Sequence, residues 1–337
     1  MSQYSKGRRL SLLRGFQESI VDRMDNKSMH GVPELDLDQY LSPLSINGLN
    51  GRMLHLPAPK KKNREILLLY GHHASLERMF GLAQAFNRYG SVTTPDMPGF
   101  GGMDSFYTIG KKPDLDNLAS YLAAFIKMRY KKRPITIIAV SLSVAVTTRM
   151  LQKYPSMVGQ VELLVSAAGF IHKDDIKFPR RKKARLAQTG RILSMAVPGM
   201  MAKAWLRAPV IRRMYRSDLK ATTSDETPER RRYRIEFEVW LWKNNDIRTH
   251  FFTIYQMLTM NLCHQQVALP IHQISVDADQ YLDNHMIEQH MRVVYSDYVS
   301  LPLPAGKAKA HAPTIIATAK EAGAFIPPRL RTILNKQ

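Results

Sequence analysis

The chain has 337 residues, 45% of them hydrophobic, and a formal net charge of +21 at pH 7. This length and composition are those of a globular protein with one large or two ordinary domains, at roughly 150 residues per domain. The single cysteine, Cys263, excludes an intrachain disulfide and a cysteine-based zinc site. No apolar run reaches the about 18 residues of a membrane span, and the positive charge favours anionic partners.

The first predicted element is a basic amphipathic helix near the N-terminus. It either packs on the body with solvated arginines or makes peripheral contact with an anionic membrane surface. Charged and polar residues interrupt its apolar face, and no small-residue cleavage site follows it. We therefore do not interpret it as a signal peptide, and we expect a cytoplasmic protein. The apolar positions at near-helical spacing are Leu10, Leu13, Phe16, Ile20 and Met24.

Residues 44–59, "LSINGLNGRMLHLPAP", show two short extended runs joined by Asn and Gly, which predicts a hairpin. From Glu65 onward, short apolar strands alternate with longer helices. This alternation predicts a parallel sheet covered by helices on both faces, and thus the α/β class. Strands are expected at "EILLLY", "SVTTPD", "PITIIAVS" and "VELLVSAA", with helices at 76–90, 115–130 and 144–155.

Residues 171–264 show helical periodicity without convincing strands, and we interpret them as an inserted helical cap. Within it, residues 191–215 mix Met, Trp and Leu with Arg and Lys. These apolar residues form either the core of the cap or the roof of a substrate pocket. After residue 265 the α/β pattern resumes with strands at 269–279 and 292–298 and helices at 284–291 and 314–323. The expected organisation is therefore an N-terminal extension (1–43), a core (44–170 and 265–337) and the cap (171–264).

Four short motifs lie at predicted strand ends. "AVSLS" has two serines among small residues, so Ser141 and Ser143 are both candidate nucleophiles, or both merely begin a helix. "LLLYGHHAS" places two histidines after a strand, but adjacent histidines without a carboxylate cluster do not indicate a metal site. "TPDMPGFGGMDS" is a glycine-rich turn without the ending of a phosphate-binding loop. The fourth motif, "AGKAKAHAPTIIATA", precedes a predicted helix.

In their order and spacing these motifs resemble those of the α/β-hydrolase superfamily with a helical cap. The resemblance covers roughly Leu44 to the C-terminus and implies a mostly parallel sheet flanked by helices. In that family the nucleophile is usually in Gly-x-Ser-x-Gly, on a strained strand-to-helix turn. Counting from Pro134 in the family's spacing selects Ser141, although Ala139 and Ser143 replace both glycines.

The resemblance also implies roles for the other motifs. Gly71 belongs to the family's His-Gly loop, with Tyr70 in the usual His position, and the backbone N–H groups of His72 and Leu142 would form the oxyanion hole. The acid would be Asp279, with Asp277 as the nearby alternative, and the base would be His311. The residues that match the family's Asp-x-Pro-Gly-x-Gly turn, a structural element, are Asp96, Pro98, Gly99 and Gly101.

The function this implies is a serine hydrolase that cleaves a carboxylic ester or thioester with an apolar acyl group, through an acyl-enzyme and without a cofactor or metal. The expected partner is a small-molecule acyl ester, apolar near the carbonyl and either neutral or anionic beyond it. Nucleic acid is not an expected partner. Two alternatives stay open. One is an acyltransferase with the same triad, and the other is a non-catalytic scaffold whose basic cap binds an anionic partner.

Overall fold

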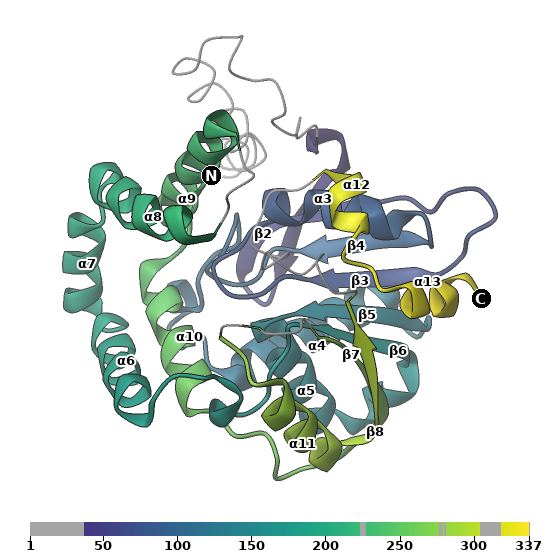
Figure 1. The fold of residues 1–337 in the computed structure, drawn as a ribbon. Coiled ribbons are helices and arrows are strands. Elements are labelled where there is room, and N and C mark those ends of the chain that lie inside the picture. Colours follow the sequence, from purple (N-terminus) through teal and green to yellow (C-terminus); the bar gives the residue numbers. More distant parts are fainter. Residues whose placement is uncertain (1–36, 223–226, 276–278, 280, 304–317, 337) are drawn as a thin grey trace.

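The computed structural model describes residues 37–222, 227–275, 279, 281–303 and 318–336 (Figure 1). Their centre is an eight-stranded sheet in the order β1-β2-β4-β3-β5-β6-β7-β8. β2 pairs antiparallel with β1 and β4, and all other neighbours are parallel, which confirms the predicted fold class. The strands are β1 Leu41–Ile46, β2 Leu49–Leu56, β3 Glu65–Leu69, β4 Ser91–Pro95, β5 Ile135–Val140, β6 Val161–Ala167, β7 Val267–Ser275 and β8 Tyr295–Pro302.

The predicted hairpin is formed by β1 and β2. Its turn consists of Asn47 and Gly48, whose φ angles are 51° and 82°. Two consecutive residues with positive φ give the backbone twist that joins antiparallel strands most readily. β1 begins at Leu41, three residues before the expected start of the core at 44.

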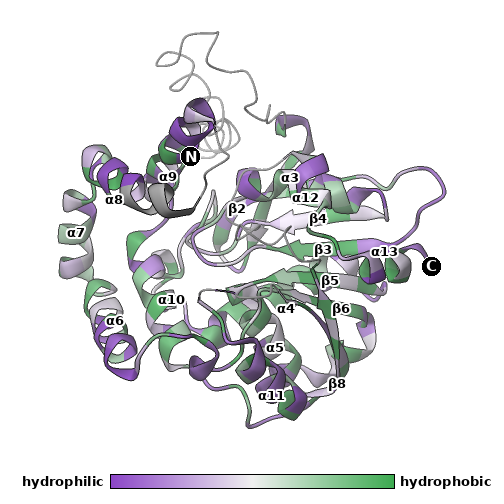
Figure 2. Cartoon of the chain, in the orientation of Figure 1, coloured by the Kyte–Doolittle hydropathy of each residue, from purple (hydrophilic) through white to green (hydrophobic). Residues whose placement is uncertain are grey.

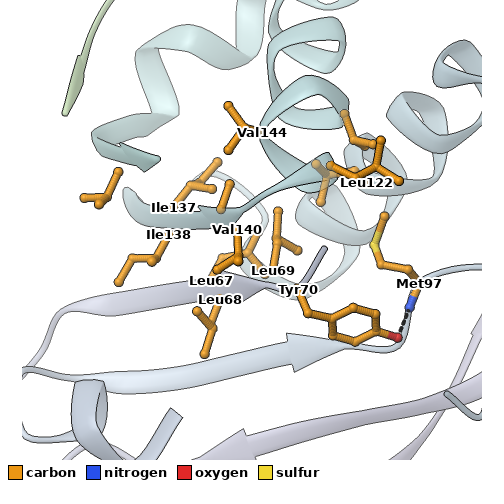
Figure 3. Packing of buried hydrophobic residues seen from close by; sticks show 14 of the residues in the cluster. Leu67, Leu68, Leu69, Tyr70, Met97, Leu122, Ile137, Ile138, Val140 and Val144 are labelled. Carbon is orange, nitrogen blue, oxygen red and sulfur yellow. Dashed lines mark hydrogen bonds between the residues drawn. The ribbon is translucent and has the colours of Figure 1, made fainter. Parts of the chain in front are cut away.

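The central strands are apolar because both faces of the sheet are covered. Every residue of β5 is buried, and in β3 only Glu65 is not (Figure 3). In Figure 1, α3, α12 and α13 lie on one face, and α4, α5 and α11 lie on the other. Strands β3 and β5 are also green, that is hydrophobic, in Figure 2. The covering helices are α3 Leu76–Asn87, α4 Leu115–Tyr130, α5 Leu142–Lys153, α11 Asn284–Val294, α12 Ala319–Gly323 and α13 Pro328–Asn335.

In the described part of the chain between β6 and β7 there are five α-helices, which we call the inserted helices. They lie to one side of the sheet, with α10 nearest to it and α7 outermost (Figure 1). Gly190 of α6 and Gly199 of α7 allow close approach to α10, because an added Cβ would lie 2.8 Å from the Phe251 carbonyl oxygen and 2.7 Å from Cγ of Arg248, respectively. Their bounds are α6 Arg180–Leu193, α7 Ala196–Trp205, α8 Ala208–Thr222, α9 Pro228–Asn244 and α10 Ile247–Thr259.

The large apolar side chains of α7 and its N-cap are exposed. The interpretation of residues 191–215 as a cap core is wrong for Met195, Val197, Met200, Met201 and Trp205, which are all 51–68% exposed, whereas Ile211 of α8 is fully buried.

The predicted N-terminal helix lies outside the described residues. Of the helix expected at 314–323, the described part is α12, and α13 follows it. Within the described ranges, no helix combines the length and apolar character needed to cross a bilayer.

Candidate active site

Ser141 occupies the turn between β5 and α5 in an unusual backbone conformation. Its φ is 55° and its ψ is −122°, a combination that costs a non-glycine residue strain energy. The surroundings enforce it, because the Ser141 N–H donates to the carbonyl of Ala167 at the end of β6 (2.9 Å) and α5 begins at the next residue. A sharp strand-to-helix turn of this kind raises a serine side chain above the sheet edge.

Gly71 lies directly against this turn. A Cβ added to Gly71 would lie 2.7 Å from Cβ of Ser141 and 3.2 Å from its Oγ. The loop after β3 therefore passes beside the Ser141 side chain only because residue 71 has no side chain. Ala139, on β5, is at the position of the first glycine of Gly-x-Ser-x-Gly. It is fully buried, and its small side chain fits there.

Ser143, the alternative nucleophile, has a different environment. It is 1% exposed, and its Oγ accepts from the Val140 N–H (2.8 Å) and lies 2.9 Å and 3.1 Å from the carbonyl oxygens of Val140 and Leu69. A hydroxyl held this way ties the first turn of α5 to two strands. The geometry favours Ser141 as the reactive serine.

The two expected oxyanion donors lie on either side of Ser141. Leu142 is the first residue of α5, and the first N–H groups of a helix have no partner within it. His72 follows Gly71, and its Nε2 donates to the His250 carbonyl on α10 (3.1 Å). Burial lowers the pKa of His72 to about 4, so its ring is neutral at pH 7. The loop is therefore anchored to the inserted helices by a neutral imidazole.

A second set of contacts fixes His73. The Oδ1 of Asn245 accepts from the Gly101 N–H (2.8 Å), so its Nδ2 is the atom that donates to Nδ1 of His73 (3.2 Å). Nδ1 of His250 lies 3.2 Å from the same nitrogen and must donate to it as well. Burial is the main cause that lowers the pKa of both His73 and His250, and the repulsion that two protonated rings would feel, with Arg78 in the case of His73, lowers it further. Three neutral imidazoles thus pack together beside the expected oxyanion hole.

The Asp96 turn is held by a buried polar network. Tyr70 donates its hydroxyl to Oδ1 of Asp96 (2.8 Å) and accepts from the Met97 N–H (2.7 Å, Figure 3). Arg52 binds Oδ2 of Asp96 (2.7 Å) and both oxygens of Glu77, and all three side chains are fully buried. Burial and the Asp96 charge raise the pKa of Tyr70, so its hydroxyl stays a donor. Tyr70 thereby links the loop after β3 to the turn after β4.

The glycines of this turn allow two close approaches. Gly101 has a φ of +59°, and an added Cβ would lie 2.0 Å from Oδ1 of Asp96. Gly99 has a φ of +84°, and an added Cβ would lie 2.5 Å from the hydroxyl oxygen of Thr249 on α10. The Gly99 carbonyl accepts from the Asp246 N–H (2.8 Å). Pro98 precedes Gly99 in the same buried turn.

Asp279 lies on the segment that follows β7. It is 6% exposed, and its Oδ1 accepts from the N–H groups of Tyr281 (2.8 Å) and Leu282 (2.9 Å). β5, β6 and β7 are adjacent and parallel, so Asp279 and Ser141 follow strands that end at the same edge of the sheet. Asp277 and His311 lie outside the described residues.

Sequence reasoning missed a second histidine cluster near this edge. Asp175 is fully buried, its Oδ1 lies 2.5 Å from Nδ1 of His290, and its Oδ2 accepts from the N–H groups of Ile171 and His172. The Asp175 carbonyl accepts from the Asp283 N–H (2.8 Å). The cluster thus ties the segment after β6 to the start of α11.

Sequence reasoning also missed the contacts that α9 and α10 make with the loop after β3. His250 and Asn245 are about 170 residues from that loop, and no local motif marks them. For metal binding, no group of three or more His, Cys, Asp or Glu in the described ranges has a suitable arrangement.

Comparison of the sequence with protein-family models and with curated proteins finds no match. Comparison of the structure finds many similar solved proteins. A putative lipase from Acinetobacter baumannii AYE has a TM-score of 0.60 at 14% identity, over 91% of this chain and 100% of that one. A membrane phospholipase A has a TM-score of 0.60 at 16% identity, with both chains fully covered. A thermophilic esterase from Thermogutta terrifontis has a TM-score of 0.52 at 13% identity, over 78% of this chain and 88% of that one.

These similarities establish the class of fold. The chain has the α/β-hydrolase fold, as the sequence motifs predicted. At identities this low, the similarity carries the fold and not the activity.

Proposed function

We propose that the protein is a serine hydrolase that cleaves a carboxylic ester or thioester through an acyl-enzyme. Ser141 is the nucleophile, His311 is the general base, and Asp279 orients His311. The observation that carries the proposal is the backbone of Ser141, held at φ 55° in a strand-to-helix turn and packed against Gly71. Strain retained at one serine at a sheet edge is typical of a reactive site.

The proposed reaction uses backbone donors beside Ser141. Ser141 Oγ attacks the carbonyl carbon while His311 takes its proton, and the N–H groups of His72 and Leu142 stabilise the negative oxygen of the tetrahedral intermediate. His311 then returns the proton to the leaving group, and water releases the acyl group by the same steps. The proposal requires no cofactor.

An apolar acyl group suits the surroundings of the loop after β3. The rings of Phe100, Trp242 and His250 lie 5.7 Å or less from the ring of His72 or His73, and the lowered pKa values keep the histidines uncharged at pH 7. An aromatic-rich environment favours an apolar group. The similar esterase and lipase structures support an ester substrate.

A chain-length series of p-nitrophenyl esters tests the proposal. We expect kcat/KM to rise by up to about two orders of magnitude for four carbons added to the acetyl group, at ~0.8 kcal/mol per buried CH₂, until the pocket is full. Ser141→Ala should abolish this hydrolysis while the protein stays folded. A folded wild-type protein that cleaves none of the esters contradicts the hydrolase. Acyl transfer to an alcohol without hydrolysis would indicate the acyltransferase, and no reaction with esters or serine probes would indicate the scaffold.

A further inference from the structure

The outermost inserted helix, α7, exposes an apolar face. Val197, Met200, Met201 and Trp205 are 61%, 65%, 68% and 65% exposed. We call these four residues the α7 face. Isolated exposed apolar residues are common, but four large ones within nine positions of one helix form a patch that needs an explanation.

The helical geometry directs the α7 face away from the protein. Gly199 is the residue of α7 that packs on α10, with an added Cβ 2.7 Å from Cγ of Arg248. At 3.6 residues per turn, Val197 and Met201, each two positions from Gly199, lie on the opposite side of the helix. Their exposed fractions of 61% and 68% agree, so these side chains point to solvent. In Figure 1, α7 is also the outermost of the inserted helices.

Positive charge surrounds the α7 face. Between Asp175 and Asp218 the sequence has twelve Lys and Arg residues and no Asp or Glu. In Figure 2, purple hydrophilic segments lie on α6 and α8, on either side of α7. Of these cations, Lys183 and Arg212 form ion pairs, with Asp174 and Glu236. The exposed ones nearest the α7 face along the chain are Arg191, Lys203, Arg207 and Arg213.

We infer that the α7 face and its surrounding cations form a docking surface for an anionic lipid bilayer. Val, Met and Trp side chains enter the boundary between headgroups and acyl chains, and Arg and Lys bind lipid phosphates. The charge complementarity selects this occupant. A nucleic acid would match the cations but not an apolar stripe of methionine and valine, and a neutral apolar partner would not need the cations. The inference concerns binding alone and is independent of the proposed activity.

Trp205 offers a direct readout, because it is the exposed tryptophan among the three in the chain, with Trp240 8% exposed and Trp242 half-buried. The full-length protein is mixed with vesicles of phosphatidylcholine containing phosphatidylglycerol, or of phosphatidylcholine alone. We expect a blue shift of the emission and quenching by brominated acyl chains with the anionic vesicles, both absent in Trp205→Phe. Flotation should show at least tenfold weaker binding to phosphatidylcholine alone, and weaker binding at high salt.

Variants separate the two components of the surface. We expect vesicle binding at least tenfold weaker in the double variant of the apolar residues, Met201→Ser with Trp205→Ser. The same loss, with a smaller salt dependence, is expected in the triple variant of the cations, Arg191→Gln with Lys203→Gln and Arg207→Gln. Matched controls are Met128→Ser with Val293→Ser, at exposed apolar residues of α4 and α11, and Arg88→Gln with Lys111→Gln and Lys132→Gln. These should bind vesicles as the wild type does.

Three results would overturn the inference. The first is vesicle binding that the α7 face variants leave unchanged, which would assign membrane contact to another part of the chain. The second is an emission of Trp205 that is typical of a buried indole before vesicles are added and does not change when they are added. This would show that the chain itself covers the α7 face. The third is a wild-type protein that is a dimer, does not bind vesicles, and becomes a monomer in the double variant Met201→Ser with Trp205→Ser. This would show that the α7 face binds a second copy of the chain.

Discussion

Gly71 packs against the side chain of Ser141, and a β-carbon on Gly71 would lie 2.7 Å from Cβ of Ser141 and 3.0 Å from the Val140 carbonyl oxygen. Gly71→Ala must therefore displace either the loop after β3 or the turn that holds the serine. We expect ester hydrolysis to fall at least about 100-fold, because an oxyanion donor and the nucleophile move apart, and stability to fall by about 1–3 kcal/mol. Gly159→Ala is the control, since nothing lies within 4 Å of its added Cβ. Wild-type activity in Gly71→Ala would contradict the contact.

Ser143→Ala separates the roles of the two serines. The substitution leaves the Val140 N–H in a buried position without its acceptor, so urea unfolding should show a loss of about 1–3 kcal/mol. Reaction of the folded variant with a serine-directed probe should persist. The control is Ser120→Ala, at a partly exposed hydroxyl on α4, which should lower the free energy of unfolding by less than Ser143→Ala does. If Ser143→Ala abolished labelling of a stable protein, Ser143 would be the nucleophile.

The ion pairs of Arg52 and Arg133 provide a matched comparison of burial. Arg52→Met leaves the buried carboxylates of Asp96 and Glu77 without their cation and should cost about 3–5 kcal/mol. Arg133→Met breaks an ion pair with Glu65 in which the arginine is 52% exposed, and it should cost about 1 kcal/mol or less. Chemical denaturation of both variants measures the difference. Equal costs would mean that the network around Asp96 does not hold the turn.

Stability should depend on pH through the three packed histidines. His72, His73 and His250 have lowered pKa values in the folded protein, so the unfolded chain binds more protons below its ordinary histidine pKa of about 6.5. Their contribution to stability is therefore present above about pH 6.5 and is lost as the pH falls toward about 4. We expect His250→Gln to reduce the loss of stability between pH 7 and pH 5 by about 1–2 kcal/mol, measured by urea unfolding at both pH values. The control substitution is His264→Gln, at an exposed histidine outside this cluster.

The strands and the short motifs at their ends were predictable from the sequence, because each depends on the chemistry of a few neighbouring residues. β3 and β5 are continuous apolar runs, and the turn at Asn47 and Gly48 needs residues that tolerate positive φ. The Asp96 turn carries glycines at the two positions where φ is positive. Such features are encoded within a few residues, so a single sequence indicates them.

Contacts between distant segments were not predictable. The assembly of His72, His73 and His250 joins a loop to a helix about 170 residues away, and Asp175 with His290 joins segments about 110 residues apart. The composition of residues 191–215 suggested a core or a pocket roof, because methionine and tryptophan are usually buried. Instead, Gly199 packs closely on α10 and Met201 points outward. The sequence around these residues does not indicate which side of α7 packs on α10.

The most direct test of the account is the reaction of the full-length protein with a fluorophosphonate probe, followed by mass spectrometry of its peptides. We predict one adduct on Ser141, present in the wild type and in Ser143→Ala and absent in Ser141→Ala, with hydrolysis reduced by up to about 10⁶-fold in the last variant. A folded wild-type protein that forms no adduct, or an adduct that survives Ser141→Ala, would contradict the assignment of Ser141 as the nucleophile.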